Sequence, residues 1–183
     1  MRMKKNRKIL IALLISTFSL SCEKWAVQIP LLRKNTPNRN AEVSATLHIG
    51  QENEELARIA QNAQNTLPFF FRHLLRPAKG ESGFRVKYPF RADPGSGFAT
   101  EQLWLSDIQF ENGVYYGVVT NTPFYIASMK KGDTVAFNAS EISDWAYIRD
   151  GKIAGGLSIS YLLGQIPEHE LSEEQRAILT MFD

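Results

Sequence analysis

Two short motifs in the sequence combine a serine with an aspartate, the residue types of nucleophilic catalysis. Ser106-Asp107 comes shortly after Trp104, and Ser143-Asp144 directly precedes Trp145. A serine nucleophile needs a general base within hydrogen-bonding distance, whereas neighbouring residues on a strand point to opposite faces of a sheet. We therefore expect the Ser-Asp side chains to bond backbone amides where a strand turns, and the neighbouring tryptophans to fill the core. The motifs predict no catalytic residue.

The three histidines do not predict a base, a metal site or a cofactor site. His48 lies near the N-terminal polar segment, His73 in a predicted helix, and His169 in a polar stretch before the last helix. Histidines scattered in this way lack the ligand spacing of a zinc site. The glycine-rich stretches lack the Lys-Ser/Thr pair and the helix start of a phosphate-binding loop. We therefore predict no metal and no cofactor.

Aromatic residues are the richest set of candidate binding groups. In a strand, Trp104 faces away from its two leucine neighbours, and Tyr115 and Tyr116 face opposite sides, so one of the two tyrosines should be exposed. An exposed aromatic side chain on a sheet can bind peptide, glycan or protein. The favoured alternative is that both tryptophans belong to the core. The residues of this predicted binding or structural motif are Trp104, Ser106, Asp107, Ser143, Asp144, Trp145, Tyr115 and Tyr116.

The N-terminus has the pattern of a secretory signal. Residues 1–8 contain five basic groups and no acid, residues 9–20 carry no charge, and the only cysteine, Cys22, comes just after them. Twelve residues are too few for a membrane span, which needs about 20. The pattern is similar to bacterial lipoprotein signals, in which the cysteine becomes the lipidated first residue, although Ser19 stands where these usually have leucine. We predict a signal peptide over 1–21 and lipidation of Cys22; the alternatives are a buried free cysteine in an uncleaved N-terminal helix and a plain secretory signal that is cut nearby. The resemblance implies that Glu23 directs the protein to the outer membrane, facing the periplasm.

Removal of the signal would change the charge of the chain. Five of the 21 basic residues and none of the 19 acidic ones precede Cys22. The mature chain would therefore carry 16 basic and 19 acidic residues, a net charge of −3. This balance argues against a nucleic-acid-binding protein. Residues 22–52 contain two prolines and a polar basic run. They are predicted to be a tether, with a short stretch of strand period near Val43.

Residues 53–183 are predicted to form one α+β domain. Apolar residues recur at helical spacing from Asn53, and Pro68 predicts a kink or a new helix start. Five or more short antiparallel strands follow, with tight turns at Asn112-Gly113 and Asp150-Gly151. Ser172 is expected to cap a last helix. The predicted architecture is a kinked N-terminal helix on a small, strongly curved antiparallel sheet or half-open barrel, with a short C-terminal helix.

An ordered set of short motifs in this domain resembles the YegJ-like proteins, a bacterial family with a domain of unknown function, some of whose members are short lipoproteins. The resemblance covers roughly residues 53–180 and implies no established activity. The motifs that carry it are Thr66-Leu67-Pro68-x-Phe70, Phe84-x-Val86-Lys87, Glu101-x-x-Trp104-Leu105-Ser106-Asp107-Ile108, Gly117-x-Val119-x-Asn121-x-Pro123, Lys131-Gly132-Asp133-x-Val135, Ile142-Ser143-Asp144-Trp145-x-Tyr147 and Asp150-Gly151-Lys152-x-x-Gly155-Gly156.

The sequence thus predicts a cell-envelope lipoprotein that is not an enzyme and whose domain binds another molecule. Its partners would be the membrane, through Cys22, and an envelope or toxin protein, with an immunity-like role as the specific form and no nucleic acid bound. The alternative is an envelope hydrolase acting on the cell wall or an acyl bond. Its polar cluster would be drawn from Glu101, Ser106, Asp107 and Asp144, at least two of them beside a histidine. A third possibility is a structural scaffold with an exposed apolar patch.

Overall fold

Helix α2 (Glu54–Leu75) begins the part of the chain that the computed structural model describes, residues 54–182. The predicted signal peptide, Cys22 and the tether lie outside these described residues. The later helices are α3 (Leu157–Gly164) and α4 (Glu173–Leu179), with short 3-10 turns at Ala139–Glu141 and Glu168–Glu170. The strands are β1 (Glu81–Arg91), β2 (Thr100–Glu111), β3 (Val114–Val119), β4 (Thr134–Phe137), β5 (Asp144–Arg149) and β6 (Lys152–Gly155).

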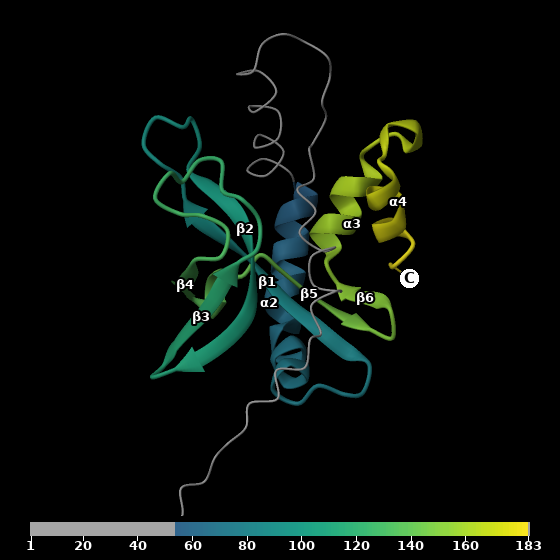
Figure 1. The fold of residues 1–183 in the computed structure, drawn as a ribbon, viewed down its shortest axis with the longest axis horizontal. Coiled ribbons are helices and arrows are strands. Elements are labelled where there is room, and N and C mark those ends of the chain that lie inside the picture. The colour runs from purple at the N-terminus through teal and green to yellow at the C-terminus, as the bar shows by residue number, and fades with distance from the viewer. Residues whose placement is uncertain (1–53, 183) are drawn as a thin grey trace, which may run out of the picture.

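The six strands form one antiparallel sheet in the order β4-β3-β2-β1-β5-β6 (Figure 1). The predicted tight turns connect β2 to β3 and β5 to β6. Asn112 and Gly113 have φ of 50° and 85°, and Asp150 and Gly151 have φ of 50° and 81°. Two consecutive positive φ values are typical of the two-residue turns whose twist matches that of the flanking strands. The sheet is not closed into a barrel, and the predicted α+β class is confirmed.

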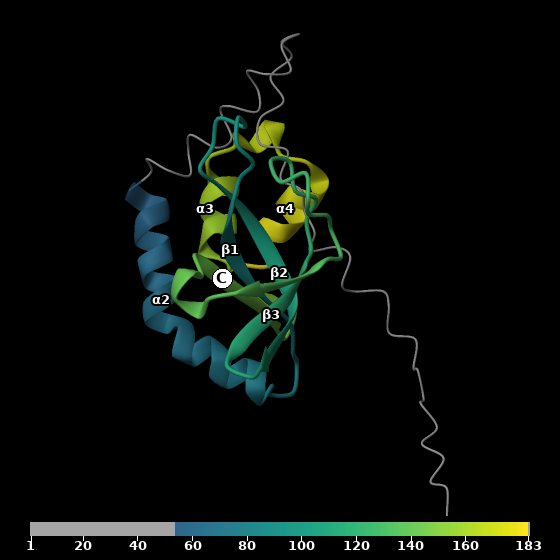
Figure 2. The same ribbon diagram turned by 90° about the vertical axis from the view of Figure 1, so that its left-hand side faces the viewer.

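Helix α2 is continuous through Pro68, where the sequence predicted a kink or a new start. It lies along one side of the sheet and bends along its length (Figure 2). Its buried residues recur at helical spacing: Ile59, Ala63, Leu67 and Phe70. Burial of this stripe stabilises the helix although the proline removes one backbone donor.

Helix α3 is an element that the sequence analysis did not separate from the preceding strand. Gly155 and Gly156 both have positive φ, 76° and 66°, and turn the chain directly from β6 into the helix. This glycine pair therefore marks the start of a helix. In α4, the predicted cap is confirmed: the Ser172 Oγ accepts from the Gln175 N–H at 3.1 Å, and the Gln175 side chain accepts from the Ser172 N–H at 2.8 Å.

Apolar side chains are buried on both faces of the sheet. Trp145 and Tyr147 of β5 face α2 and belong to the first core cluster, together with Phe70. Ala146, between them, belongs to a second cluster with Leu163 of α3 and with residues of α4. Because successive side chains of a strand alternate, α2 covers one face and the α3–α4 segment covers part of the other.

Candidate functional site

The two Ser-Asp motifs have different surroundings. Ser106 and Asp107 lie where the pairing of β2 with β3 shifts register, and Asp107 has a φ of 50°. The Ser106 hydroxyl donates to the Asp107 carboxylate at 3.0 Å in an exposed position. Such a register shift with a left-handed residue is a β-bulge. The first motif is thus a local backbone feature of an exposed strand.

The second motif joins three elements, and its aspartate is buried while its serine is half-buried. Asp144 is 2% exposed, and its two carboxylate oxygens accept from the Trp145 N–H and from the Ser158 N–H, each at 2.8 Å. The Ser143 hydroxyl contacts the Lys87 carbonyl oxygen at 3.2 Å and the Gln102 side chain at 2.7 Å. Asp144 therefore bonds backbone amides, as predicted. One of those amides belongs to the first turn of α3, where the helix dipole favours an acid.

Lys87 stands between Trp104 and Asp144 in a row across three strands. It is paired directly with each of them in the ladders that β1 forms with β2 and β5. The Lys87 Nζ donates to the Ser158 Oγ at 3.1 Å and lies 5.9 Å from the centre of the Trp104 ring. Residues directly opposite each other share a face of the sheet, and this is the face that α3 covers in part.

Burial perturbs both charged groups of this row. It raises the pKa of Asp144, against the effects of the Ser158 hydrogen bonds and of the Lys87 charge. It lowers the pKa of Lys87, against the opposite effect of Asp144. A serine hydroxyl beside a lysine amine has the composition of a nucleophile and its base. However, Ser158 is 3% exposed and its N–H is bound to Asp144, so the geometry serves to hold α3 on the sheet.

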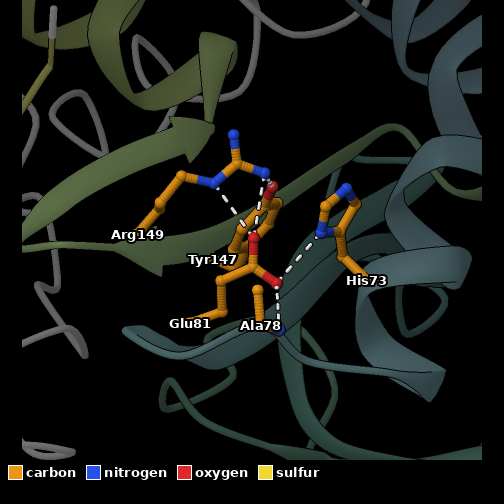
Figure 3. A network of polar contacts seen from close by, with 5 residues as sticks. All are labelled: His73, Ala78, Glu81, Tyr147 and Arg149. Carbon is orange, nitrogen blue, oxygen red and sulfur yellow. Dashed lines mark hydrogen bonds and ion pairs between the residues drawn. The ribbon is translucent and has the colours of Figure 1, made fainter.

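A second polar network joins the end of α2 to strands β1 and β5 (Figure 3). The Glu81 carboxylate is 2% exposed and accepts from the His73 Nδ1 at 2.9 Å, from the Ala78 N–H at 2.9 Å and from the Arg149 Nε at 3.0 Å. Arg149 also donates to the Tyr147 hydroxyl. The His73 ring stacks on Tyr147 with centroids 5.6 Å apart. Burial alone would raise the pKa of Glu81, but these hydrogen bonds outweigh it and the pKa is lowered.

The four side chains of the alternative hydrolase cluster do not assemble beside a histidine. Glu101 is buried, and its two oxygens accept from the backbone N–H groups of Phe124 and Tyr125 at 2.8 and 2.9 Å. Asp144 holds the amides described above. Within the described residues, the histidines pair with other acids, His73 with Glu81 and His169 with Glu170. Glu101 therefore fixes a loop to β2.

The aromatic residues divide between core and surface. Trp145 is in the first core cluster, and its Nε1 donates to Thr66 of α2 at 3.0 Å. Trp104 packs against the second cluster. Neither Tyr115 nor Tyr116 is fully exposed, because both are half-buried, and Tyr115 stacks on Phe71 of α2 with centroids 5.0 Å apart. The expectation of one exposed tyrosine is thus not met.

The exposed aromatic surface lies instead at the tip of the β2–β3 hairpin. Phe110 is 59% exposed, and its ring lies against that of Tyr115 with centroids 4.6 Å apart. Val114, 38% exposed, pairs with Glu111 and faces the other side of the hairpin. We call Phe110 and Tyr115 the hairpin patch. A second exposed ring, Phe124, is 72% exposed in the loop held by Glu101. The sequence analysis did not single out Phe110, although its place beside the Asn-Gly turn was visible.

No group of three metal-ligating side chains occurs within residues 54–182. In the same part of the chain, no helix combines the length and hydrophobicity needed to cross a membrane.

The fold and these clusters define a small α+β domain in which buried charged groups join helices to a single antiparallel sheet. The model of a bacterial family described as "Uncharacterized protein conserved in bacteria (DUF2314)" matches residues 53–179, and the chain belongs to this family. The resemblance predicted from the ordered motifs is thereby confirmed.

Two curated relatives match the chain. It is 32% identical over 134 residues to the uncharacterized protein YegJ of Escherichia coli. This match covers 73% of this chain and 84% of that protein. It is 30% identical over 138 residues to a putative ankyrin repeat protein of Neisseria meningitidis, NMB1133/NMB1171, again over 73% of this chain. The match spans about half of that longer relative, 54% of its length. No solved structure matches the chain.

Proposed function

We propose that this chain is a lipoprotein of the cell envelope whose DUF2314 domain binds another protein through the hairpin patch. The observation that carries the binding role is the 59% exposure of Phe110 beside the half-buried Tyr115. Aromatic residues are enriched at the energetic centres of protein interfaces. Helix α2 supports the patch, because Phe71 of this helix stacks on Tyr115.

Two further features support this proposal. The buried acids Glu101 and Asp144 hold backbone amides, which favours a binding role over acid–base chemistry. One relative is described as a putative ankyrin repeat protein, and stacked ankyrin repeats form extended binding surfaces. A domain of this family joined to such repeats would suit a protein that recognises other proteins.

The envelope location rests on the N-terminal sequence. The basic residues, the twelve uncharged residues and Cys22 have the order of a lipoprotein signal. We propose lipidation at Cys22 and outer-membrane attachment, with the domain in the periplasm. In its specific form the partner is a protein toxin that is neutralised by stoichiometric binding, as an immunity protein would do.

The test compares two phenylalanines that differ in position and share high exposure. Full-length protein, its Phe110→Ser variant and its Phe124→Ser variant are purified from solubilised membranes, and co-purified proteins are quantified. We expect one protein to bind in stoichiometric amount to the wild type and to Phe124→Ser, and at least about tenfold less to Phe110→Ser, since a hot-spot truncation costs about 2 kcal/mol or more. Equal recovery with all three chains contradicts the role of the hairpin patch.

A further inference from the structure

The two edges of the sheet differ in how they are covered. At β6, the Ile153 N–H donates to the Met181 carbonyl oxygen at 2.8 Å, and the Lys152 Nζ donates to the Thr180 carbonyl oxygen at 3.2 Å. The C-terminal segment thus closes that edge. Strand β4 is the other edge, on the opposite side of the sheet (Figure 1). Within the described residues, its backbone pairs with β3 alone.

The register shows which groups of β4 point away from the sheet. The Val119 N–H donates to the Asp133 carbonyl oxygen at 2.9 Å, so residue 133 faces β3. Hydrogen bonding alternates along an antiparallel strand, which directs the backbone groups of Val135 toward β3 as well. The N–H and C=O groups of Thr134 and Ala136 therefore face outward, and both of these residues are exposed.

This edge carries none of the side chains that usually prevent strand addition. Thr134–Phe137 contains no charge and no proline, whereas natural edges are commonly protected by lysine, proline or a covering segment. An outward row of unpaired backbone groups is a template for another strand. The occupant must therefore supply a strand of similar length.

We propose that the occupant is β4 of a second copy of this chain, paired antiparallel about a two-fold axis. With Val135 on the axis, Thr134 of one copy is opposite Ala136 of the other. These are the two residues whose backbone groups face outward, so the pairing satisfies both sets of groups. Self-complementarity of this kind is what a two-fold interface requires. The dimer would have one continuous sheet through both copies.

Charge complementarity supports a second copy as the occupant. In this register the exposed Lys130 and Lys131, just before β4, lie at the same end of the interface as Glu141 of the other copy, just after its β4. Glu141 is exposed as well. Because of the two-fold axis, this contact between opposite charges occurs twice in the dimer. The proposed contact uses the backbone groups of β4, whereas the hairpin patch lies on β2 and β3, with Tyr115 stacked on Phe137 of β4.

Sedimentation velocity of the full chain in detergent, over a series of protein concentrations, tests the proposal. We expect a monomer–dimer equilibrium for the wild type. Ala136→Pro removes an outward N–H that makes no bond to β3, and should reduce dimerisation at least about tenfold while the thermal unfolding midpoint stays close to that of the wild type. A wild-type chain that remains monomeric at every concentration overturns the proposal.

Charge reversal provides a second test that does not depend on proline. Glu141→Lys alone places like charges together and should weaken the dimer about tenfold. Adding Lys130→Glu and Lys131→Glu to the same chain restores opposite charges and should restore the dimer. If the triple variant dimerises no better than Glu141→Lys alone, the proposed register is wrong.

Discussion

Gly155 is the position at which a single methyl group should do the most damage. It ends β6, has a φ of 76° and pairs with Ala146 of β5. A Cβ added there would lie 2.2 Å from the carbonyl oxygen of Trp145 and 2.5 Å from its ring. That same oxygen accepts the Gly156 N–H at 2.7 Å, immediately before α3. The backbone oxygen cannot move without loosening the start of the helix.

The magnitude follows from comparison with a glycine that has similar backbone geometry and open surroundings. Gly113 has a φ of 85° and no atom within 4 Å of an added Cβ. Gly113→Ala should therefore cost only the left-handed backbone strain, about 1–2 kcal/mol. Gly155→Ala should cost this and an overlap with fixed backbone, which adds about 1–3 kcal/mol. At about 4 °C per kcal/mol for a domain of this size, Gly155→Ala should melt about 8 °C below Gly113→Ala.

The assay is thermal unfolding of the two full-length variants and the wild type, followed by circular dichroism at one pH. The strain common to both variants cancels in their difference, which isolates the contact with Trp145. Equal midpoints for Gly155→Ala and Gly113→Ala would refute the close approach of β6 to β5 and, with it, the argument that this glycine pair positions α3.

Two further predictions concern the buried carboxylates. Asp144→Asn should lower the free energy of unfolding by about 2 kcal/mol, because the two backbone N–H groups bind different carboxylate oxygens and the amide replaces one of these oxygens with an NH2 donor, so one N–H is left unpaired. The matched change Asp107→Asn at the exposed bulge should lower the free energy of unfolding by less than about 0.5 kcal/mol. If chemical denaturation gives equal losses of unfolding free energy for the two variants, the assignment of Asp144 to two backbone amides is wrong. The folded-state pKa of Glu81 is lowered, so its stabilisation is present above the ordinary carboxyl value of 4.5 and is lost as the pH falls through the folded value. The unfolding midpoint of Glu81→Gln should therefore lie furthest below that of the wild type at neutral pH and approach it in acid, and a pH-independent difference would contradict the ionised network.

Local sequence signals predicted much of the architecture. The Asn112-Gly113 and Asp150-Gly151 turns, the strand periods between them and the Ser172 cap all act through residues that are close in the chain. Hydrophobic periodicity also predicted the first helix, which is continuous through Pro68 and bends along its length (Figure 2). Burial of the apolar stripe on α2 and the hydrogen bond from Thr66 to the Asn62 carbonyl oxygen at 2.7 Å accompany an unbroken helix there.

Helix α3 and the polar clusters could not be predicted because they depend on contacts between distant residues. The segment after Gly156 is apolar and has no acidic residue in its first turn, so it lacks the usual sequence signature of a helix start. Its N-cap residue is Gly156, and the acid that accepts from the Ser158 N–H of its first turn is Asp144, from another element. Lys87 reaches Ser158 across 71 positions, and Arg149 reaches Glu81 across 68. Each of these side chains is unremarkable in its own stretch of sequence.

The proposed function itself is tested most directly by native mass spectrometry of the full-length protein released from membranes in detergent. One spectrum reports both the mass of the chain and the mass of what is bound to it. The account predicts a chain that begins at Cys22, carries two or three acyl groups, and forms a complex with one partner protein that Phe110→Ser abolishes. A chain that retains residues 1–21, with an unmodified Cys22 and no protein bound, would contradict it.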